Sequence, residues 1–262
     1  MDKNKFSIVM PIHEYNDTMK ELVVKAVKSV PSDYTLSVFY GGNGNVEDLS
    51  FIIDEHELSS IYLVERGNDF STMMNEAVKV LKENKYEWFS ILEFDDEFNS
   101  IWFDEIVKEI KDKPDVSIFL PLTEIVDYES NKFLSYGNEA PWASSFSSEI
   151  GFIDKDSLEQ FFDFYLTGSV FNIKDWNYVG GLKESIKLSF WYEFLLRMTH
   201  NEKKVYVIPK LGYKHYVNRE GSLFDQYKNT MDEKESQWWY NLALEEYAYK
   251  KDRKKTYLEN NI

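Results

Sequence analysis

The chain of 262 residues suits one large domain, and its hydrophobic content of 43% is ample for a packed core. It contains no cysteine, which excludes disulfides, thiolate catalysis and cysteine-ligated metal. A net charge of −16 disfavours a broad contact with the phosphate backbone of nucleic acids. No apolar run approaches the roughly 20 residues of a membrane span, and no secretory leader is recognisable, so a cytoplasmic location is expected.

The first half of the chain alternates between strand-like and helix-like segments. Short apolar runs predict strands, and apolar residues at helical spacing predict helices. The expected strands are residues 6–11, 34–40, 60–64, 86–92 and 116–122, and the expected helices are residues 18–30, 49–56, 71–83 and 101–111. This alternation is typical of right-handed βαβ units, so we expect an α/β fold with a mainly parallel sheet flanked by helices.

The second half is less regular. We expect, in chain order, a β-hairpin over residues 124–136, a short helix over 156–165, a strand over 169–173, a helix over 190–202 and a strand over 204–209. A long C-terminal helix, rich in aromatic residues, is expected over residues 233–255. These shorter elements predict a smaller, mixed region beside the main sheet.

A cluster of carboxylates, Glu93, Asp95, Asp96 and Glu97, directly follows the fourth expected strand. Unpaired carboxylates are costly to bury. At the carboxyl edge of a parallel sheet, where ligands bind, they can hold a hard divalent cation and through it a phosphate. The cluster therefore predicts chemistry on a nucleotide-activated substrate. In the purely structural alternative, Asp96 caps the helix that follows.

Further segments of the chain follow a familiar order. They read SIVMP at residues 7–11, NDFSTMMN at 68–75, ILEFDD at 91–96, GSVF at 168–171, VGGLKE at 179–184 and NREGSL at 218–223. In this order they resemble the motifs of family 2 glycosyltransferases, which have the Rossmann-like GT-A fold. The resemblance implies a catalytic domain over residues 1–225, with a nucleotide-sugar-binding half (1–122) and an acceptor half (123–225). Residues 226–262 would then form a C-terminal helical extension.

The resemblance implies transfer of a sugar from a nucleotide-sugar, usually a UDP-sugar, with inversion at the anomeric carbon. It also implies a Mn²⁺ or Mg²⁺ ion bridging the donor's diphosphate, which stabilises the charge of the departing nucleoside diphosphate. The acceptor hydroxyl would belong to a glycan, a protein, a lipid-linked saccharide or a modified nucleobase. The acidic balance of the chain disfavours the last of these.

The same resemblance gives the expected site residues. The metal is expected at Asp95, assisted by Glu93, Asp96 and the late histidine His215. The expected donor-binding residues are Pro11, His13, Tyr40, Asn68, Asp95 and Arg219. The family's usual aspartate pair after the second strand falls here on Tyr40 and Gly41, which leaves the preference for uracil open.

The catalytic base departs most from the family pattern. The usual Glu-Asp pair, counted back from Arg197, falls on Phe190 and Trp191, and neither side chain can accept a proton. The remaining candidate bases are Glu193, one helical turn before Arg197, and Glu184, which follows a glycine pair. Carboxylates from the irregular middle of the chain, Glu149 and Asp154, are further alternatives.

These departures leave two other functions to consider. A catalytically weakened GT-A module would bind a nucleotide-sugar or a glycan without turnover, and the missing Glu-Asp pair supports it. A nucleotidyltransferase would need a glycine-rich, arginine-containing loop after the first strand, and residues 12–16 (IHEYN) do not form one.

Overall fold

The computed structural model describes residues 2–41, 45–65, 69–186 and 189–220, and also Ser222, Lys234, Gln237, Trp238 and residues 240–242. The strands are β1 (Phe6–Ile12), β2 (Thr35–Gly41), β3 (Ser59–Val64), β4 (Trp88–Ile91), β5 (Glu97–Phe98), β6 (Val116–Asp127), β7 (Phe133–Gly137), β8 (Phe152–Ile153), β9 (Val170–Asn172) and β10 (Lys204–Val217). The α-helices are α1 (Lys20–Lys28), α2 (Phe51–Glu55), α3 (Phe70–Glu83), α4 (Trp102–Asp112), α5 (Lys155–Gln160), α6 (Ile173–Val179) and α7 (Phe190–His200). Short 3-10 turns cover Lys3–Lys5, Asp17–Met19, Val46–Leu49 and Ala140–Trp142.

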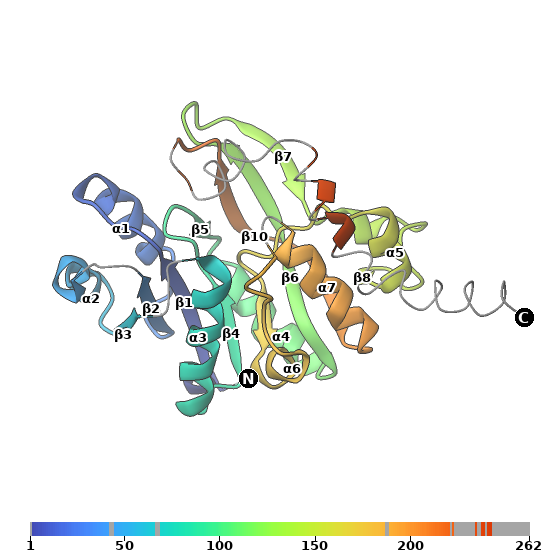
Figure 1. Ribbon diagram of the computed structural model, residues 1–262, viewed down its shortest axis with the longest axis horizontal. Helices are drawn as coiled ribbons and strands as arrows, with labels where there is room; N and C mark the ends of the chain where they lie inside the picture. The colour runs from blue at the N-terminus through green and yellow to red at the C-terminus, as the bar shows by residue number, and fades with distance from the viewer. Residues whose placement is uncertain are drawn as a thin grey trace, which may run out of the picture.

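The first half of the chain forms the parallel part of the sheet, with the strand order β3-β2-β1-β4. Helices α1, α2 and α3 connect these strands in turn, as expected of βαβ units (Figure 1). Each strand and helix predicted for residues 6–111 is present, with ends that differ by a few residues. The prediction of an α/β fold with a mainly parallel sheet flanked by helices is confirmed.

The second half extends the same sheet. β9 runs antiparallel between β4 and β6 and so joins the two halves. β10 pairs in parallel with β6, and the predicted hairpin is present as β6 and β7. The described strands thus form one sheet, ordered β3-β2-β1-β4-β9-β6-β10-β5, with β7 added to β6 and β8 to β10.

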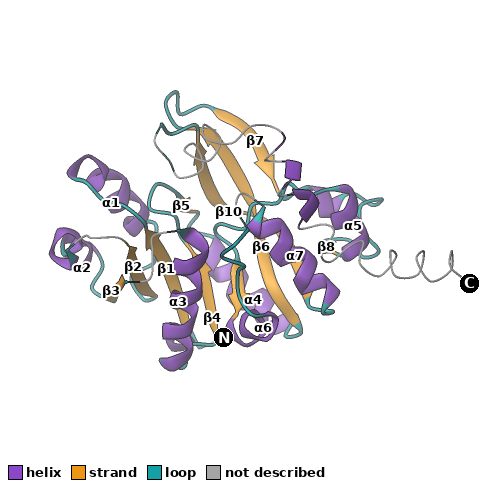
Figure 2. Cartoon of the chain, in the orientation of Figure 1, coloured by secondary structure: helices purple, strands orange, loops and turns teal. Residues whose placement is uncertain are grey.

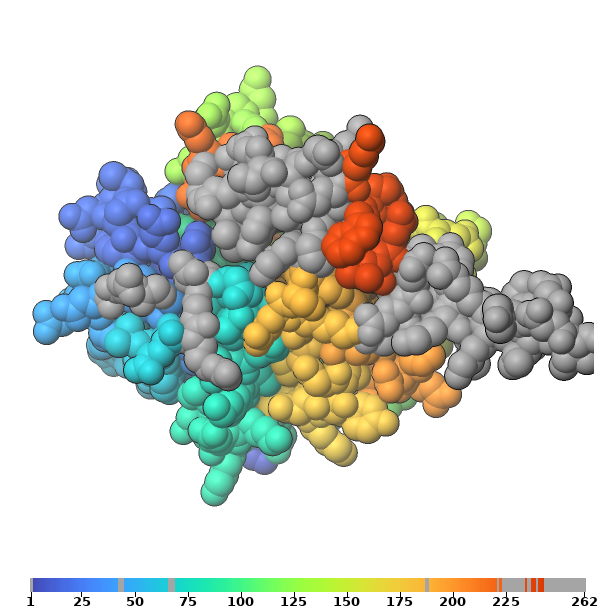
Figure 3. Space-filling model, viewed as in Figure 1, coloured from blue at the N-terminus to red at the C-terminus, as the bar shows by residue number. Residues whose placement is uncertain are grey.

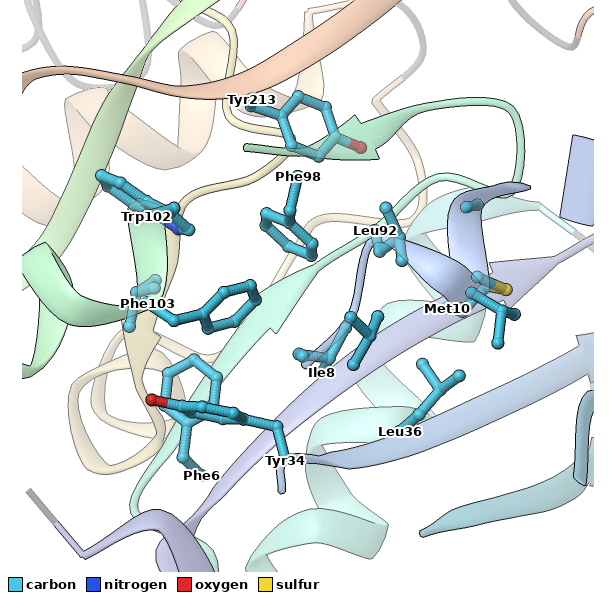
Figure 4. Close-up of a cluster of buried hydrophobic side chains, with 14 of the residues drawn as sticks. Phe6, Ile8, Met10, Tyr34, Leu36, Leu92, Phe98, Trp102, Phe103 and Tyr213 are labelled. Carbon is cyan, nitrogen blue, oxygen red and sulfur yellow. The ribbon is translucent and has the colours of Figure 1, made fainter. Parts of the chain in front are cut away.

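Helices cover both faces of this sheet (Figure 2). Because successive strand residues point to opposite faces, β1 contributes Phe6, Ile8, Met10 and Ile12 to one core and Val9 to the other. The first of these cores packs against α1, α2 and α4, and Figure 4 shows its centre around Ile8, Tyr34 and Phe103. The second core packs against α3, α6 and α7. No helix in the described part of the chain is long and apolar enough to span a membrane.

Two strands are longer than predicted. β6 continues beyond the expected end at residue 122 to Asp127, and β10 continues beyond residue 209 to Val217. The two strands pair along almost their full lengths, and register shifts between Val207 and Tyr213 accommodate Pro209 and Gly212. Pairing with a long partner therefore overrides the two residues that signal a strand end in the sequence.

The helices of the second half also differ from prediction. The helix expected over 156–165 ends at Gln160, because Phe161 is extended and its ring packs edge-on against Phe146 and Phe164. Helix α6 was not predicted, although Asn172 caps its start and Gly180 ends it in the left-handed conformation. The predicted C-terminal helix lies largely outside the described residues, and the domain boundary at residue 225 stays a prediction.

Candidate active site

The acidic segment after β4 folds into a turn. The N–H of Asp96 donates to the carbonyl of Glu93 (3.1 Å), which places Phe94 and Asp95 at the tip and brings Glu93 and Asp96 together at the base. β5 follows at once and pairs antiparallel with β10, with Glu97 opposite Lys214. The turn is therefore fixed against the end of β10, a strand that comes more than a hundred residues later in the chain.

Asp96 is fully buried at this junction and binds β10 with both carboxylate oxygens. Its Oδ2 lies 2.8 Å from Nδ1 of His215, and its Oδ1 accepts the N–H of Tyr216 (2.8 Å). Burial by itself lowers the pKa of His215, but the carboxylates of Asp96, Glu93 and Asp95 outweigh it and raise that pKa to about 9. Because Nδ1 faces Asp96, the other ring nitrogen of His215 is the one that can bind a metal.

Glu93 completes a cluster with Asp96 and His215. One candidate ligand atom from each of the three residues lies within 4.8 Å of the others. The backbone N–H of Glu93 donates to the hydroxyl of Tyr213 (3.0 Å), and burial together with Asp96 raises the pKa of the Glu93 carboxyl to about 8. Two carboxylates and an imidazole suit Mn²⁺, and the oxygens also suit Mg²⁺. These residues therefore fit the divalent cation that the sequence predicts.

Asp95 faces a different partner. Its Oδ2 accepts a hydrogen bond from Nε of Arg219 (2.6 Å), and both side chains are nine-tenths buried. Asn218 adopts the left-handed conformation just after β10, which turns the chain so that Arg219 reaches back over the Phe94 ring at 5.1 Å. The candidate metal cluster thus consists of Glu93, Asp96 and His215, whereas Asp95 lies beside it in an ion pair.

The predicted donor-binding residues separate into three groups. His13 lies on the same side as Arg219, with its ring 5.9 Å from Phe94, and burial and Arg219 lower its pKa. Pro11 and Tyr40 are buried in or beside the sheet, and Tyr40 belongs to the core under α1 and α2 rather than to an open surface. Asn68 lies outside the described residues.

The aromatic residues at the family's base position form a packed cluster. Phe190 stacks on Phe70 at 5.3 Å, and Trp191 packs on both Phe70 (5.6 Å) and Phe171 (5.8 Å). Helices α3 and α7 therefore meet through aromatic rings at their N-terminal ends. None of these side chains can accept a proton.

The two leading candidate bases have different surroundings. Glu193 is fully buried, and both of its carboxylate oxygens accept hydrogen bonds from Arg197 (3.0 and 2.8 Å). That geometry suits a structural role and does not present Glu193 to an acceptor. Glu184 is exposed, and its Oε1 lies 3.3 Å from Nδ2 of Asn75.

The two remaining candidate bases, Asp154 and Glu149, also differ in their surroundings. Asp154 caps α5 by accepting the N–H of Ser157 (2.8 Å) and also accepts the N–H of Ser148 (2.9 Å). Glu149 is exposed in the segment before β8. Of the described candidates, Glu184 is the carboxylate that is exposed and also held by a side chain of α3.

Sequence reasoning missed two residues that shape this site. Tyr213 is buried and supports the backbone of Glu93, and Asn75 contacts the segment that carries Glu184. Tyr213 gives no local signal, because its partner lies 120 residues earlier. Asn75 stands in the quoted motif at residues 68–75, but its partner cannot be inferred from a single sequence.

Comparison with known proteins identifies the fold. No protein-family model matches the chain, and no curated protein matches it in sequence. Residues 1–349 of S. aureus TarS in complex with UDP-GlcNAc align with a TM-score of 0.60 and 13% identity, over 83% of this chain and 60% of that chain. The chain has the GT-A fold.

Two further solved structures also match the fold of this chain. A second structure of S. aureus TarS 1–349 matches with a TM-score of 0.60 and 12% identity, over 94% of this chain and 73% of that chain. GalNAc-T7 with UDP, GalNAc and Mn²⁺ matches with a TM-score of 0.57 and 12% identity, over 83% of this chain and 44% of that chain. At these identities the likeness concerns the fold, and activity must be argued from the site.

Proposed function

We propose that this protein is a glycosyltransferase that moves a sugar from a nucleotide-sugar to an acceptor hydroxyl with a bound divalent cation. The observation that carries the proposal is the Glu93–Asp96–His215 cluster at the carboxyl end of β4 in a GT-A fold. A UDP-sugar is the proposed donor, because TarS was solved with UDP-GlcNAc and GalNAc-T7 with UDP and Mn²⁺.

In this proposal, different residues bind the cation and the diphosphate of the donor. Glu93, Asp96 and His215 surround the cation position, and His13 lies on the donor side near Arg219. Arg219, which borders the same carboxylates, can donate to diphosphate oxygens. When bound, Mn²⁺ or Mg²⁺ supplies positive charge to the leaving diphosphate.

Glu184 is the proposed base of an inverting reaction. Its carboxylate takes the proton of the acceptor hydroxyl while that oxygen bonds to the anomeric carbon from the face opposite the diphosphate. The bond between the anomeric carbon and the diphosphate oxygen breaks, and the nucleoside diphosphate leaves with the electron pair. Glu193 supports the segment that carries Glu184.

Metal-dependent donor binding tests the proposal. We expect the melting temperature to rise by several degrees when UDP-sugars and Mn²⁺ are added together, since a ligand at 100 times its Kd stabilises a protein by about 2.7 kcal/mol. Glu93→Gln should lose most of this rise, because it removes one carboxylate of the cluster. Glu87→Gln is the matched control, because Glu87 is an exposed carboxylate paired with Lys5 just before β4. An undiminished rise in Glu93→Gln would contradict the proposal.

A GT-A module that binds a nucleotide-sugar without turnover is the second candidate. Phe190 and Trp191 favour it, because they stand where the resemblance places the base and pack against Phe70. Release of UDP from a bound UDP-sugar separates the two functions. Metal-dependent binding with no UDP release, with or without glycan acceptors, would favour the module.

A further inference from the structure

The loop between α6 and α7 is clamped by a side chain from the nucleotide-binding half. Nδ2 of Asn75 donates to the carbonyl of Leu182, and Oδ1 of Asn75 accepts the N–H of the same residue, both at 2.8 Å. Nδ2 is also 3.3 Å from Oε1 of Glu184. One amide group thus pairs with the loop backbone as a neighbouring strand would, and it contacts the Glu184 carboxylate as well.

Gly181 makes this close approach possible. Its φ of +69° lies in the left-handed region, and a Cβ at this position would lie only 2.4 Å from Oδ1 of Asn75. Trp176 closes the other side, with its Nε1 at 3.1 Å from the same Cβ position. The absence of a side chain at Gly181 therefore leaves the space that the Asn75 amide occupies.

The opposite side of the loop is held by α7. Nη1 of Arg197 donates to the carbonyl of Val179 (2.6 Å), and Arg197 is fixed in turn by two hydrogen bonds to Glu193. Nζ of Lys183 lies 3.4 Å from Oε1 of Glu193. The segment before Glu184 is thus tied to α3 at Leu182 and to α7 at Val179 and Lys183, with buried partners on the α7 side.

This loop leads to the ligand edge of the sheet. α3 begins with Asp69 as its N-cap at the carboxyl ends of the parallel strands, and α7 begins beside it through the Phe70–Phe190 stack. α3 and the segment that contains α6 and α7 lie side by side in Figures 1 and 3. The described part of the loop, residues 181–186, is held against α3 at Leu182, and Glu184 is exposed two residues later.

We propose that Asn75 is a positioning residue for the transfer reaction, which fixes the loop and the carboxylate of Glu184 relative to the donor bound on the same half of the molecule. The inference rests on the proposed function and extends it. A residue held from both sides keeps a reactive group within the narrow range of productive geometry, and a displacement of about 1 Å can cost roughly 100-fold in rate. Asn75 itself takes no part in bond making.

The test combines a structural and a kinetic measurement on the full chain. In Asn75→Ala, hydrogen exchange at the Leu182 amide should become at least about tenfold faster, because that amide loses its acceptor. The rate of UDP release should fall about 10- to 100-fold, while the Kd for UDP-sugar and Mn²⁺ changes less than about twofold. Asn75→Asp is the second variant if Asn75→Ala folds poorly: it keeps the acceptor for the Leu182 N–H but turns a carboxylate oxygen toward Glu184, so UDP release should slow while exchange at Leu182 changes little. Asn84→Ala is the control, since Asn84 is the C-cap at the far end of α3 and its side chain donates to the carbonyl of Val80.

A double-mutant cycle decides whether Asn75 acts through Glu184. In the Glu184→Gln background, Asn75→Ala should cause little additional loss of rate. Independent, multiplying losses would overturn the inference, and so would unchanged exchange at Leu182. If the wild-type protein shows no metal-dependent binding of any nucleotide-sugar, the proposed function itself fails, and the exchange measurement still reports whether the clamp exists.

Discussion

At the residue scale, Glu93 combines a functional gain with a structural cost. Burial and the neighbouring Asp96 raise the pKa of its carboxyl from 4.5 to about 8 in the metal-free protein. Between these two pH values the folded state keeps a proton that the unfolded state has released. The folded state therefore loses stability as the pH rises through this window, and a bound cation would remove the cost.

Replacing Glu93 by glutamine should therefore stabilise the metal-free protein. We expect Glu93→Gln to raise the melting temperature at pH 8 by several degrees, at about 2–4 °C per kcal/mol for a chain of this size. The difference from wild type should become small near pH 4.5, where the folded carboxyl is protonated and the unfolded one is half protonated. Thermal unfolding in the presence of a chelator, measured from pH 4.5 to 8.5, checks both limits.

Glu87→Gln is the control for this prediction, because Glu87 is an exposed carboxylate paired with Lys5. It should leave the melting temperature almost unchanged across the same range, since exposed ion pairs contribute little. A Glu93→Gln variant that is less stable than wild type at pH 8 without metal would show that ionisation of Glu93 does not destabilise the folded state.

The residues of the site were predictable, but their grouping was not. The four carboxylates and His215 stand out in the sequence by type and by their position after strands. An extended segment would have pointed Asp95 and Glu93 to the same side, whereas the turn from Glu93 to Asp96 places Asp95 at its tip. The Asp96–His215 contact joins residues 119 apart, and no local pattern specifies such a contact.

At the element scale, β10 is the strand that builds the site. It supplies Tyr213 and His215 and ends just before Arg219. Only its first six residues were predicted as a strand, because Pro209 and Gly212 are typical strand breakers. Local propensity located the strand, and pairing with β6, which depends on the whole sheet, determined its length.

The packing of β10 against the segment before β9 gives an element-scale prediction. Gly168 has a φ of +77°, and a Cβ there would lie 2.5 Å from the ring of Tyr213, which is buried and supports Glu93. We expect Gly168→Ala to cost about 2–4 kcal/mol of unfolding free energy, from left-handed strain and overpacking together. It should also weaken metal-dependent donor binding. Urea unfolding and the Mn²⁺ thermal shift measure the two effects.

Gly180→Ala separates strain from overpacking. Gly180 has a similar φ of +89°, but the nearest atom to its added Cβ would be Nη1 of Arg197 at 3.9 Å. We therefore expect a loss of only about 1–2 kcal/mol, from the backbone alone. Equal losses of unfolding free energy in the two alanine variants would mean that the Tyr213 ring moves away from the new methyl group. Tyr213 would then not hold Glu93 in place.

At the scale of the whole molecule, the buried residues of the two cores in the described chain all lie before residue 214. Their buried residues lie between Val9 and Val207 for one core and between Phe6 and Tyr213 for the other. Among the described residues after Ser222, Tyr240 packs on this body, with its ring 4.8 Å from Phe162 and 6.1 Å from Tyr192. Alternating hydrophobic patterns made the two-layered core predictable, whereas this long-range aromatic contact was not.

A chain that ends at residue 225 should therefore fold and keep metal-dependent donor binding. Among the described residues it retains all buried members of the two cores and the site residues up to Arg219, and it loses the Tyr240 contacts, which are worth about 0.5–1.5 kcal/mol each. We expect its melting temperature to fall by a few degrees, and Tyr240→Ala in the full chain to reproduce most of that fall. Near-ultraviolet circular dichroism and the Mn²⁺–UDP-sugar thermal shift test this. Loss of the near-ultraviolet signal in the shortened chain would place the domain boundary beyond residue 225. A fall in melting temperature far larger than that of Tyr240→Ala would assign the C-terminal segment a structural role in the domain.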